Sequence, residues 1–179
     1  MTRELDITTL IRTVADFPRP GILFRDITTL LKRADGFHAA VDALANAFRD
    51  RRIDQVAAIE SRGFIIGAAL AFALNTGFVP IRKRGKLPAE NFGQDYALEY
   101  GADRLEMHVD ALQRGERVAL VDDLVATGGT AEAALRLIGL AGASVAGCGF
   151  IVALPALGGR RRLEELGHPV FALCEFPGH

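Results

Sequence analysis

Residues 118–130, VALVDDLVATGGT, constrain the fold of this chain more than any other stretch. Four apolar residues typical of a buried strand lead to the carboxylates Asp122 and Asp123, and a loop of small residues follows. An apolar-periodic helix is predicted from Ala131 to about Ala141. In open α/β sheets, ligands bind outside the carboxyl ends of the strands. The segment therefore predicts a parallel sheet with a polar ligand site at this edge.

The rest of the chain alternates in the same way between strand-like and helix-like stretches. Short apolar runs typical of buried strands occupy residues 55–59, 78–81, 144–154 and 170–173. Helices are predicted over 37–48, with Asp35 as the cap, and over 64–74. This is the pattern of an α/β fold, a mostly parallel central sheet flanked by helices on both faces. At 179 residues, we expect a single domain over residues 1–179.

The loop after the two aspartates has the composition of a phosphate site. Its backbone N–H groups precede a predicted helix, and its two glycines add no Cβ atoms. The predicted phosphate-binding residues are Ala126, Thr127, Gly128, Gly129 and Thr130. A phosphate beside two carboxylate acceptors suits a ribose 5-phosphate, with Asp122 and Asp123 receiving the 2′- and 3′-hydroxyls. The alternative interpretation is an exposed acidic turn before a glycine-rich helix start.

Charge and motif content argue against several classes of function. The 21 Lys and Arg against 22 Asp and Glu leave a net charge of −1, which gives no overall attraction to nucleic acid or to a membrane. The longest apolar stretch, residues 64–74, is too short to cross a bilayer, and the polar start of the chain predicts a cytoplasmic location. Neither a P-loop nor a dinucleotide-binding fingerprint is present. The scattered His and Cys residues predict no zinc site, and the two cysteines are expected to be core residues.

Motifs along nearly the whole chain resemble one family, the type I phosphoribosyltransferases, and within it the adenine branch. They are FPRPGILFRDIT at 17–28, ESRGF at 60–64, RKRGKLP at 82–88, LEYG at 98–101 and FPGH at 176–179, in addition to the segment at 118–130. The resemblance implies an enzyme of purine salvage. It would transfer the phosphoribosyl group of phosphoribosyl pyrophosphate (PRPP) to adenine, with release of AMP and pyrophosphate.

The resemblance assigns the pyrophosphate to two basic or small-residue segments. The residues implied are Glu60, Ser61, Arg62, Gly63, Arg82, Lys83 and Lys86. Arg62 presents the forked guanidinium that such oxygens favour, and we expect it to take part in catalysis. Without the resemblance, these residues would be interpreted as a solvated arginine after a strand and a basic surface turn, and the latter interpretation is kept for Arg84.

The base and the covering loop are also assigned by resemblance. Leu23, Phe24 and Arg25 match positions that line the adenine pocket, with the Phe24 ring as the stacking face and main-chain groups for the purine edge. Glu99 and Tyr100 match residues over the active site, and Glu99 is the candidate for handling the purine proton. The alternative interpretations are that Phe24 packs in the core and that Glu99 is a solvated glutamate of the loop. The N-terminal segment and the mobile loop at 89–107 are expected to form a small hood.

The resemblance also implies Mg²⁺ as cofactor and a homodimer. Because Mg²⁺ keeps its waters, we expect it to be held mainly by PRPP and water, with no dedicated protein ligands. Two other functions stay open at this point. One is a phosphoribosyltransferase for hypoxanthine, guanine or xanthine, and the other is a non-catalytic PRPP-sensing regulator. A regulator of DNA would need a docking extension or a basic face, which the charge does not support.

Overall fold

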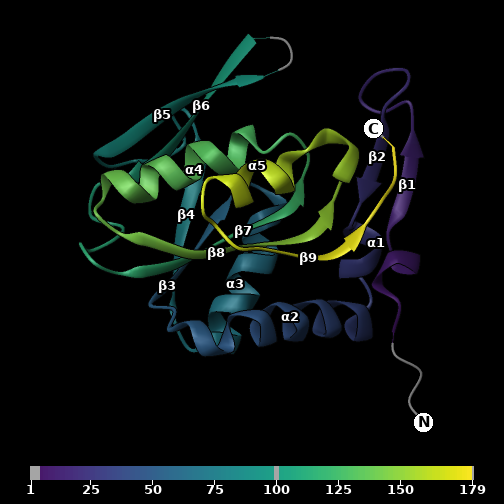
Figure 1. Cartoon of the computed structure of the whole chain (residues 1–179), viewed down its shortest axis with the longest axis horizontal. Helices are drawn as coiled ribbons and strands as arrows, with labels where there is room; N and C mark the ends of the chain where they lie inside the picture. Colours follow the sequence, from purple (N-terminus) through teal and green to yellow (C-terminus); the bar gives the residue numbers. More distant parts are fainter. Residues whose placement is uncertain (1–4, 99–100, 179) are drawn as a thin grey trace.

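The computed structural model describes residues 5–98 and 101–178 (Figure 1). Its strands are β1 (Arg12–Ala15), β2 (Leu23–Asp26), β3 (Gln55–Ile59), β4 (Gly77–Lys83), β5 (Asn91–Leu98), β6 (Gly101–His108), β7 (Arg117–Val125), β8 (Ser144–Ala153) and β9 (Val170–Glu175). Its α-helices are α1 (Thr28–Leu31), α2 (Ala34–Phe48), α3 (Arg62–Leu74), α4 (Gly129–Leu140) and α5 (Gly159–Glu165). Short 3₁₀ turns cover η1 (Ile7–Leu10), η2 (Arg49–Arg51) and η3 (Pro155–Leu157).

The large sheet has the strand order β5-β6-β4-β3-β7-β8-β9. Strands β4, β3, β7, β8 and β9 are parallel neighbours, whereas β6 pairs antiparallel with both β4 and β5. After β3 the chain adds β4 on one side, and it later returns to add β7 on the other. This reversal creates a crevice between the carboxyl ends of β3 and β7, the place where sheets of this kind bind ligands.

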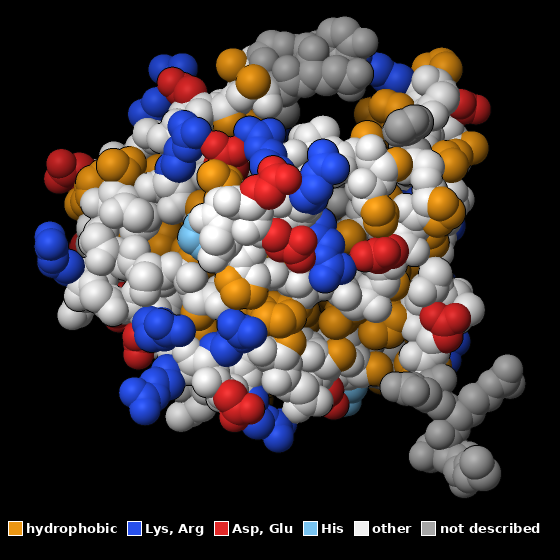
Figure 2. Space-filling view, viewed as in Figure 1, with side chains coloured by type: hydrophobic (Ala, Val, Ile, Leu, Met, Phe, Trp, Pro, Cys, Tyr) orange, Lys and Arg blue, Asp and Glu red, His pale blue; other side chains and the backbone are white. Residues whose placement is uncertain are grey.

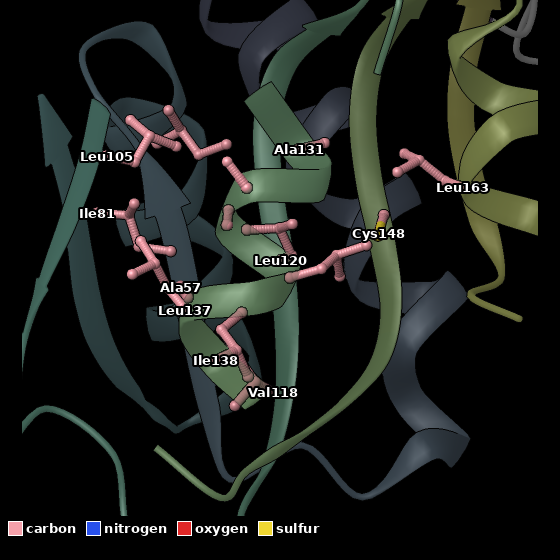
Figure 3. Packing of buried hydrophobic residues seen from close by; sticks show 14 of the residues in the cluster. Ala57, Ile81, Leu105, Val118, Leu120, Ala131, Leu137, Ile138, Cys148 and Leu163 are labelled. Carbon is pink, nitrogen blue, oxygen red and sulfur yellow. The ribbon is translucent and has the colours of Figure 1, made fainter. Parts of the chain in front are cut away.

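Helices cover both faces of the sheet, with α4 and α5 on one side and α2 and α3 on the other (Figure 1). Alternate residues of β7 pack into two hydrophobic clusters, one on each face of the sheet. Val118 and Leu120 pack in the cluster that contains α4, where Figure 3 shows them beside Leu137 and Ile138, while Ala119 packs in the cluster with α2 and α3. A strand buried on both faces must be apolar throughout, which explains why 118–121 carries no polar residue.

The predicted fold class is confirmed, with two local corrections. Strand β7 continues to Val125 instead of ending at Val121, because Asp122 pairs with Phe150 of β8 and keeps the backbone in the sheet. Asp35 does not cap its helix, so that prediction is wrong. Helix α2 begins at Ala34, and the Asp35 carboxylate in its first turn accepts from Gly36 N–H and binds Arg33 instead.

The two parts expected to form the hood lie apart in the sheet topology. Strands β1 and β2 make a separate antiparallel pair, whereas the residues at 89–107 include β5 and nearly all of β6, a hairpin that extends the main sheet beyond β4. The end of the described chain runs beside β2 (Figure 1). There the Arg25 guanidinium donates to the Pro177 carbonyl at 3.1 Å and lies 4.5 Å from the centre of the Phe176 ring. The C-terminal segment therefore fastens the β1–β2 pair to the body of the protein.

Both cysteines are buried free thiols, as expected for core residues. Burial raises the pKa of the Cys148 thiol to about 12 and that of the Cys174 thiol to about 11. Within the described ranges, no helix has the length and apolar character that crossing a membrane requires.

Candidate active site

A cavity of about 470 Å³ opens at the carboxyl ends of β3 and β7, where the strand order of the sheet reverses. Its walls come from five strands and the starts of two helices. They consist of Ile59, Glu60, Ser61, Arg62, Lys83, Tyr96, Asp103, Leu105, Asp122, Asp123 and Thr130. A more open depression of about 540 Å³ lies where β3 and β7 begin, and it contains none of the predicted site residues. It is lined by Ala47, Asp50, Arg51, Arg52 and Arg117. The cavity at the carboxyl ends is therefore the candidate site.

The two predicted ribose acceptors, Asp122 and Asp123, have different partners. The Asp123 carboxylate, 6% exposed as a residue, forms an ion pair with Nε of Arg62. The Asp122 Oδ1 accepts from the Asp123 backbone N–H at 2.8 Å. Burial and the neighbouring Asp123 charge raise the pKa of Asp122 well above its usual range. A ligand that brings hydrogen-bond donors or positive charge would therefore stabilise the charged form of Asp122.

Gly63 explains how the segment after β3 comes so close to these carboxylates. A Cβ atom at this position would lie 2.7 Å from the Asp122 Oδ1 and 3.3 Å from the Val121 carbonyl oxygen. Real Cβ atoms do not come within 3.0 Å of such an atom, so any larger residue would push the start of α3 away from β7 or displace the Asp122 carboxylate. The predicted pyrophosphate residues Glu60, Ser61 and Arg62 consequently share one cavity with Asp122.

Arg62 also connects this cavity to the predicted base segment. Its guanidinium carbon lies 5.1 Å from the centre of the Phe24 ring, and that ring packs edge-to-face on Phe17 at 5.2 Å. The Arg25 side chain turns away, because it is bound to Thr13 and Pro177, so only its main chain is available to a base. Leu23 is 37% exposed on the same strand. The structure thus puts Phe24 beside Arg62 and gives Arg25 a structural role for its side chain.

The basic segment at the end of β4 is divided between the cavity and its rim. Lys83 lines the cavity and forms an ion pair with Asp103 at 3.1 Å. Arg82 does not line it, because its Nε donates to Glu60 at 2.9 Å and its Nη1 to the Lys86 carbonyl at 3.1 Å. Lys86 is exposed and lies outside the lining set.

The predicted phosphate loop crosses from β7 into α4. Thr130 lines the main cavity, and Gly129 lines a smaller one of about 180 Å³ beside it. Gly128 has φ +82°, a left-handed conformation that favours glycine. Ala126 is half-buried and Thr127 is exposed. The loop therefore meets the cavity through its last residue, at the N-terminus of α4.

Tyr96 and Asp103 line the cavity but did not emerge from the sequence. They face each other across the hairpin, and the Tyr96 hydroxyl donates to Asp103 at 3.2 Å. Burial and the Asp103 charge raise the pKa of Tyr96 to about 12. Reading 91–108 as a period-2 hairpin would have paired them. Glu99 and Tyr100 lie outside the described residues, between the end of β5 and the start of β6.

Comparison with known proteins gives one answer. Residues 27–174 match the phosphoribosyl transferase domain family. The adenine phosphoribosyltransferase of Nitrosospira multiformis is 59% identical over 175 residues, which are 98% of this chain and 100% of that protein.

Solved structures agree with the sequence match. The adenine phosphoribosyltransferase of Thermoanaerobacter pseudethanolicus superposes with a TM-score of 0.91 at 47% identity, over 95% of this chain and 98% of the other. That of Saccharomyces cerevisiae, complexed with D-2,5-dideoxy-2,5-imino-altritol 1,6-bisphosphate and adenine, gives 0.87 at 40% identity, over 94% and 96%. The agreement of sequence and fold shows that this chain belongs to the phosphoribosyltransferase family, in its adenine phosphoribosyltransferase group.

Proposed function

We propose that this enzyme transfers the 5-phosphoribosyl group of PRPP to adenine, giving AMP and pyrophosphate. One observation carries the proposal beyond family membership. Arg62 contacts Asp123 on one side and the Phe24 ring on the other, so the segments expected to bind pyrophosphate, ribose and base converge on one side chain. This convergence is what a reaction between a base and a pyrophosphate-activated ribose requires.

PRPP would lie along the carboxyl edge of the sheet. Its 5-phosphate would meet the N-terminal end of α4 at residues 126–130, where unpaired backbone N–H groups and the helix dipole favour an anion. Its ribose hydroxyls would donate to Asp122 and Asp123. Its pyrophosphate would face Arg62 and Lys83, which line the cavity together with Ser61, and Gly63 follows in the first turn of α3. Arg82 and Lys86 support this wall from the rim, because Arg82 donates to Glu60 in the wall and to the Lys86 carbonyl.

The reaction is displacement at ribose C1, with pyrophosphate leaving and adenine attacking. Arg62 is suited to stabilise the negative charge that develops on the leaving group, since its guanidinium already stands between the two substrate regions. Phe24 would hold the purine by stacking, a contact that contributes roughly 1–3 kcal/mol per base. Glu99 would handle the purine proton, as the family resemblance implies. The remaining contribution of the chain is to hold both substrates in line.

Mg²⁺ is the proposed cofactor, and the donors present fit it. Asp122 and Asp123 supply the carboxylate oxygens that Mg²⁺ accepts, and the described residues contain no cluster of three His, Cys, Asp or Glu side chains able to act as a cage. An ion held mainly by substrate oxygens and water suits such a site. When bound, Mg²⁺ would neutralise charge on the pyrophosphate.

Homodimer formation and a cytoplasmic location stay predictions. One observation supports self-association. Phe72 is 90% exposed and Ile65 is 46% exposed, and their spacing of seven residues puts both on one face of α3. Sedimentation analysis of the wild type and of Phe72→Glu tests it, since the substitution should shift a dimer toward monomer.

Base selectivity provides the decisive test. Adenine presents a 6-amino donor and an N1 acceptor, whereas hypoxanthine and guanine present a 6-oxo acceptor and N1–H, so a site matched to one leaves groups unpaired with the other. Pyrophosphate release from PRPP and Mg²⁺ should therefore be far faster with adenine than with hypoxanthine, guanine, xanthine, orotate or uracil, by roughly 10²-fold or more. Equal kcat/KM for adenine and hypoxanthine would favour the oxopurine alternative. Tight PRPP binding without turnover of any base would favour the regulator.

A further inference from the structure

The side of the phosphate loop that faces away from the main cavity is packed against the start of α5. The Gly159 N–H donates to the Ala126 carbonyl at 2.9 Å. A Cβ atom on Gly159 would lie 2.3 Å from that oxygen and 2.6 Å from the Gly128 nitrogen. Backbone therefore rests directly on backbone, and the loop cannot shift without moving α5.

Arg162 reinforces this contact less than one helical turn further along α5. Its Nε donates to Glu132 Oε2 at 2.6 Å, its Nη2 reaches the same oxygen at 2.6 Å, and its Nη1 donates to the Thr127 carbonyl at 3.5 Å. Arg162 thus joins α5 to both the phosphate loop and the first turn of α4. It lines the small cavity beside Gly129 and is absent from the lining of the main cavity, so it stands behind the loop.

Arg162 binds Glu132, a carboxylate near the proposed phosphate site. Glu132 lies in the first turn of α4, the helix end proposed to receive the 5-phosphate, and its side chain is only 14% exposed. Burial alone would raise its pKa, but hydrogen bonds from Arg136 and Arg162 outweigh burial and lower it. Glu132 is therefore an anion close to a second expected anion. Figure 2 shows basic and acidic side chains interleaved on the surface over α4 and α5. Helix α4 carries Glu132 and Arg136, and α5 carries Arg162.

We propose that Arg162 is a positioning residue for PRPP. It acts through Glu132, whose charge it neutralises and whose carboxylate it holds away from the 5-phosphate, while its bond to Thr127 fixes the loop. Arg162 itself touches no substrate. The proposal rests on the function given above, because it concerns the 5-phosphate end of the same substrate.

The test compares Arg162→Ala with Arg161→Ala. Arg161 is its neighbour on α5, is 81% exposed and contacts only Glu165, at 3.6 Å, among the ion pairs of the described residues. In Arg162→Ala, we expect the Kd and the KM for PRPP to rise roughly tenfold, as for loss of one charged hydrogen bond, with kcat and the KM for adenine changed less than about threefold. Arg161→Ala should match the wild type. Equal PRPP affinity in both variants would overturn the proposal.

A double variant separates action through Glu132 from general loss of packing. Arg162→Ala/Glu132→Gln removes the carboxylate charge that Arg162 no longer holds and that only Arg136 still pairs with, so it should bind PRPP at least threefold more tightly than Arg162→Ala alone. Without such recovery, the role assigned to Glu132 is wrong. Arg162→Lys, which keeps the charge and loses the fork, serves if the alanine variant does not fold, and it should weaken PRPP binding by a smaller factor.

Calorimetric titration with PRPP and Mg²⁺ distinguishes the two levels of the argument. A wild-type enzyme that binds no PRPP would contradict the proposed function. A wild type that binds PRPP, together with an Arg162→Ala variant of unchanged affinity, would contradict only the role of Arg162.

Discussion

Replacing Asp122 by Asn separates the part this carboxylate plays in PRPP binding from its effect on folding. Burial and the charge of Asp123 raise the pKa of Asp122. When the pKa of an acid is higher in the folded chain than in the unfolded chain, the folded state becomes less stable as pH rises between the two values. The reason is that the folded state still holds a proton that the unfolded state has released. At neutral pH the wild type carries this cost, and the Asn variant does not.

The local geometry accepts the amide. Its Oδ1 can still take the hydrogen bond from the Asp123 N–H, now 2.8 Å from Asp122 Oδ1, and its Nδ2 can donate to the Asp123 carboxylate. We therefore expect Asp122→Asn to melt at or above the wild-type temperature at pH 7.5, with the difference vanishing toward pH 4. Each 1 kcal/mol of relief corresponds to roughly 2–4 °C in a chain of this size.

Activity should move in the opposite direction. A hydrogen bond to a charged group contributes roughly 1.5–3 kcal/mol, so losing the charge at one ribose contact should lower kcat/KM for PRPP by about 10- to 150-fold. Initial rates of pyrophosphate release at saturating adenine measure this. Asp123→Asn is the comparison, since it should lose activity and also the ion pair with Arg62. The reasoning fails if Asp122→Asn melts well below the wild type at neutral pH, or if the double Asn variant keeps wild-type kinetics.

Three further outcomes are expected. Gly63→Ala should lower stability by about 1–3 kcal/mol through overpacking against Asp122 and raise the KM for PRPP, whereas Gly139→Ala, where a Cβ meets nothing within 4 Å, should stabilise α4 slightly in thermal melts. Similar effects of the two changes would contradict the close approach described for Gly63. Glu99→Gln should cut kcat by roughly 10²–10⁴-fold in steady-state assays with little change in PRPP affinity, and a loss below tenfold would reduce Glu99 to loop positioning. Arg25→Met, which frees the C-terminal segment, should raise the KM for adenine roughly tenfold, as for one charged hydrogen bond, and leave the KM for PRPP unchanged. Equal effects on both substrates would show that the β1–β2 pair does not act on the base alone.

The sequence predicted the central strands well because their physics is simple. Residues 55–59 were expected as a strand and form β3 with those bounds, since the four residues after Gln55 are buried on both faces of the sheet and all are apolar. The boundary of β7 was missed because the polar Asp122 looks like the end of a strand, while its backbone still pairs with β8. A polar side chain such as that of Asp122 indicates that the residue faces the site. It does not indicate where the backbone hydrogen bonds of the strand end.

The candidate site was predictable where its residues follow a strand directly. Asp123 was identified in this way, whereas Arg62 was assigned by the family resemblance. Their ion pair joins positions 61 residues apart and follows only from the adjacency of β3 and β7. Tyr96 and Asp103 were missed because Gly93, Gly101 and several charged residues interrupt the hydrophobic alternation of the hairpin. Their contact depends on strand register, which a sequence pattern specifies poorly when both faces carry polar residues.

Because both thiols are buried, we expect the wild-type chain to react very little with cysteine-labelling reagents. A maleimide reacts with the thiolate, and at pH 7 Cys148 and Cys174, with pKa values of about 12 and 11, have almost none. These are the two cysteines of the chain. A new cysteine at the exposed Ala102, near the start of β6, would therefore carry a fluorophore alone. The response of the hairpin to PRPP and to adenine could then be followed in real time without altering a single core residue.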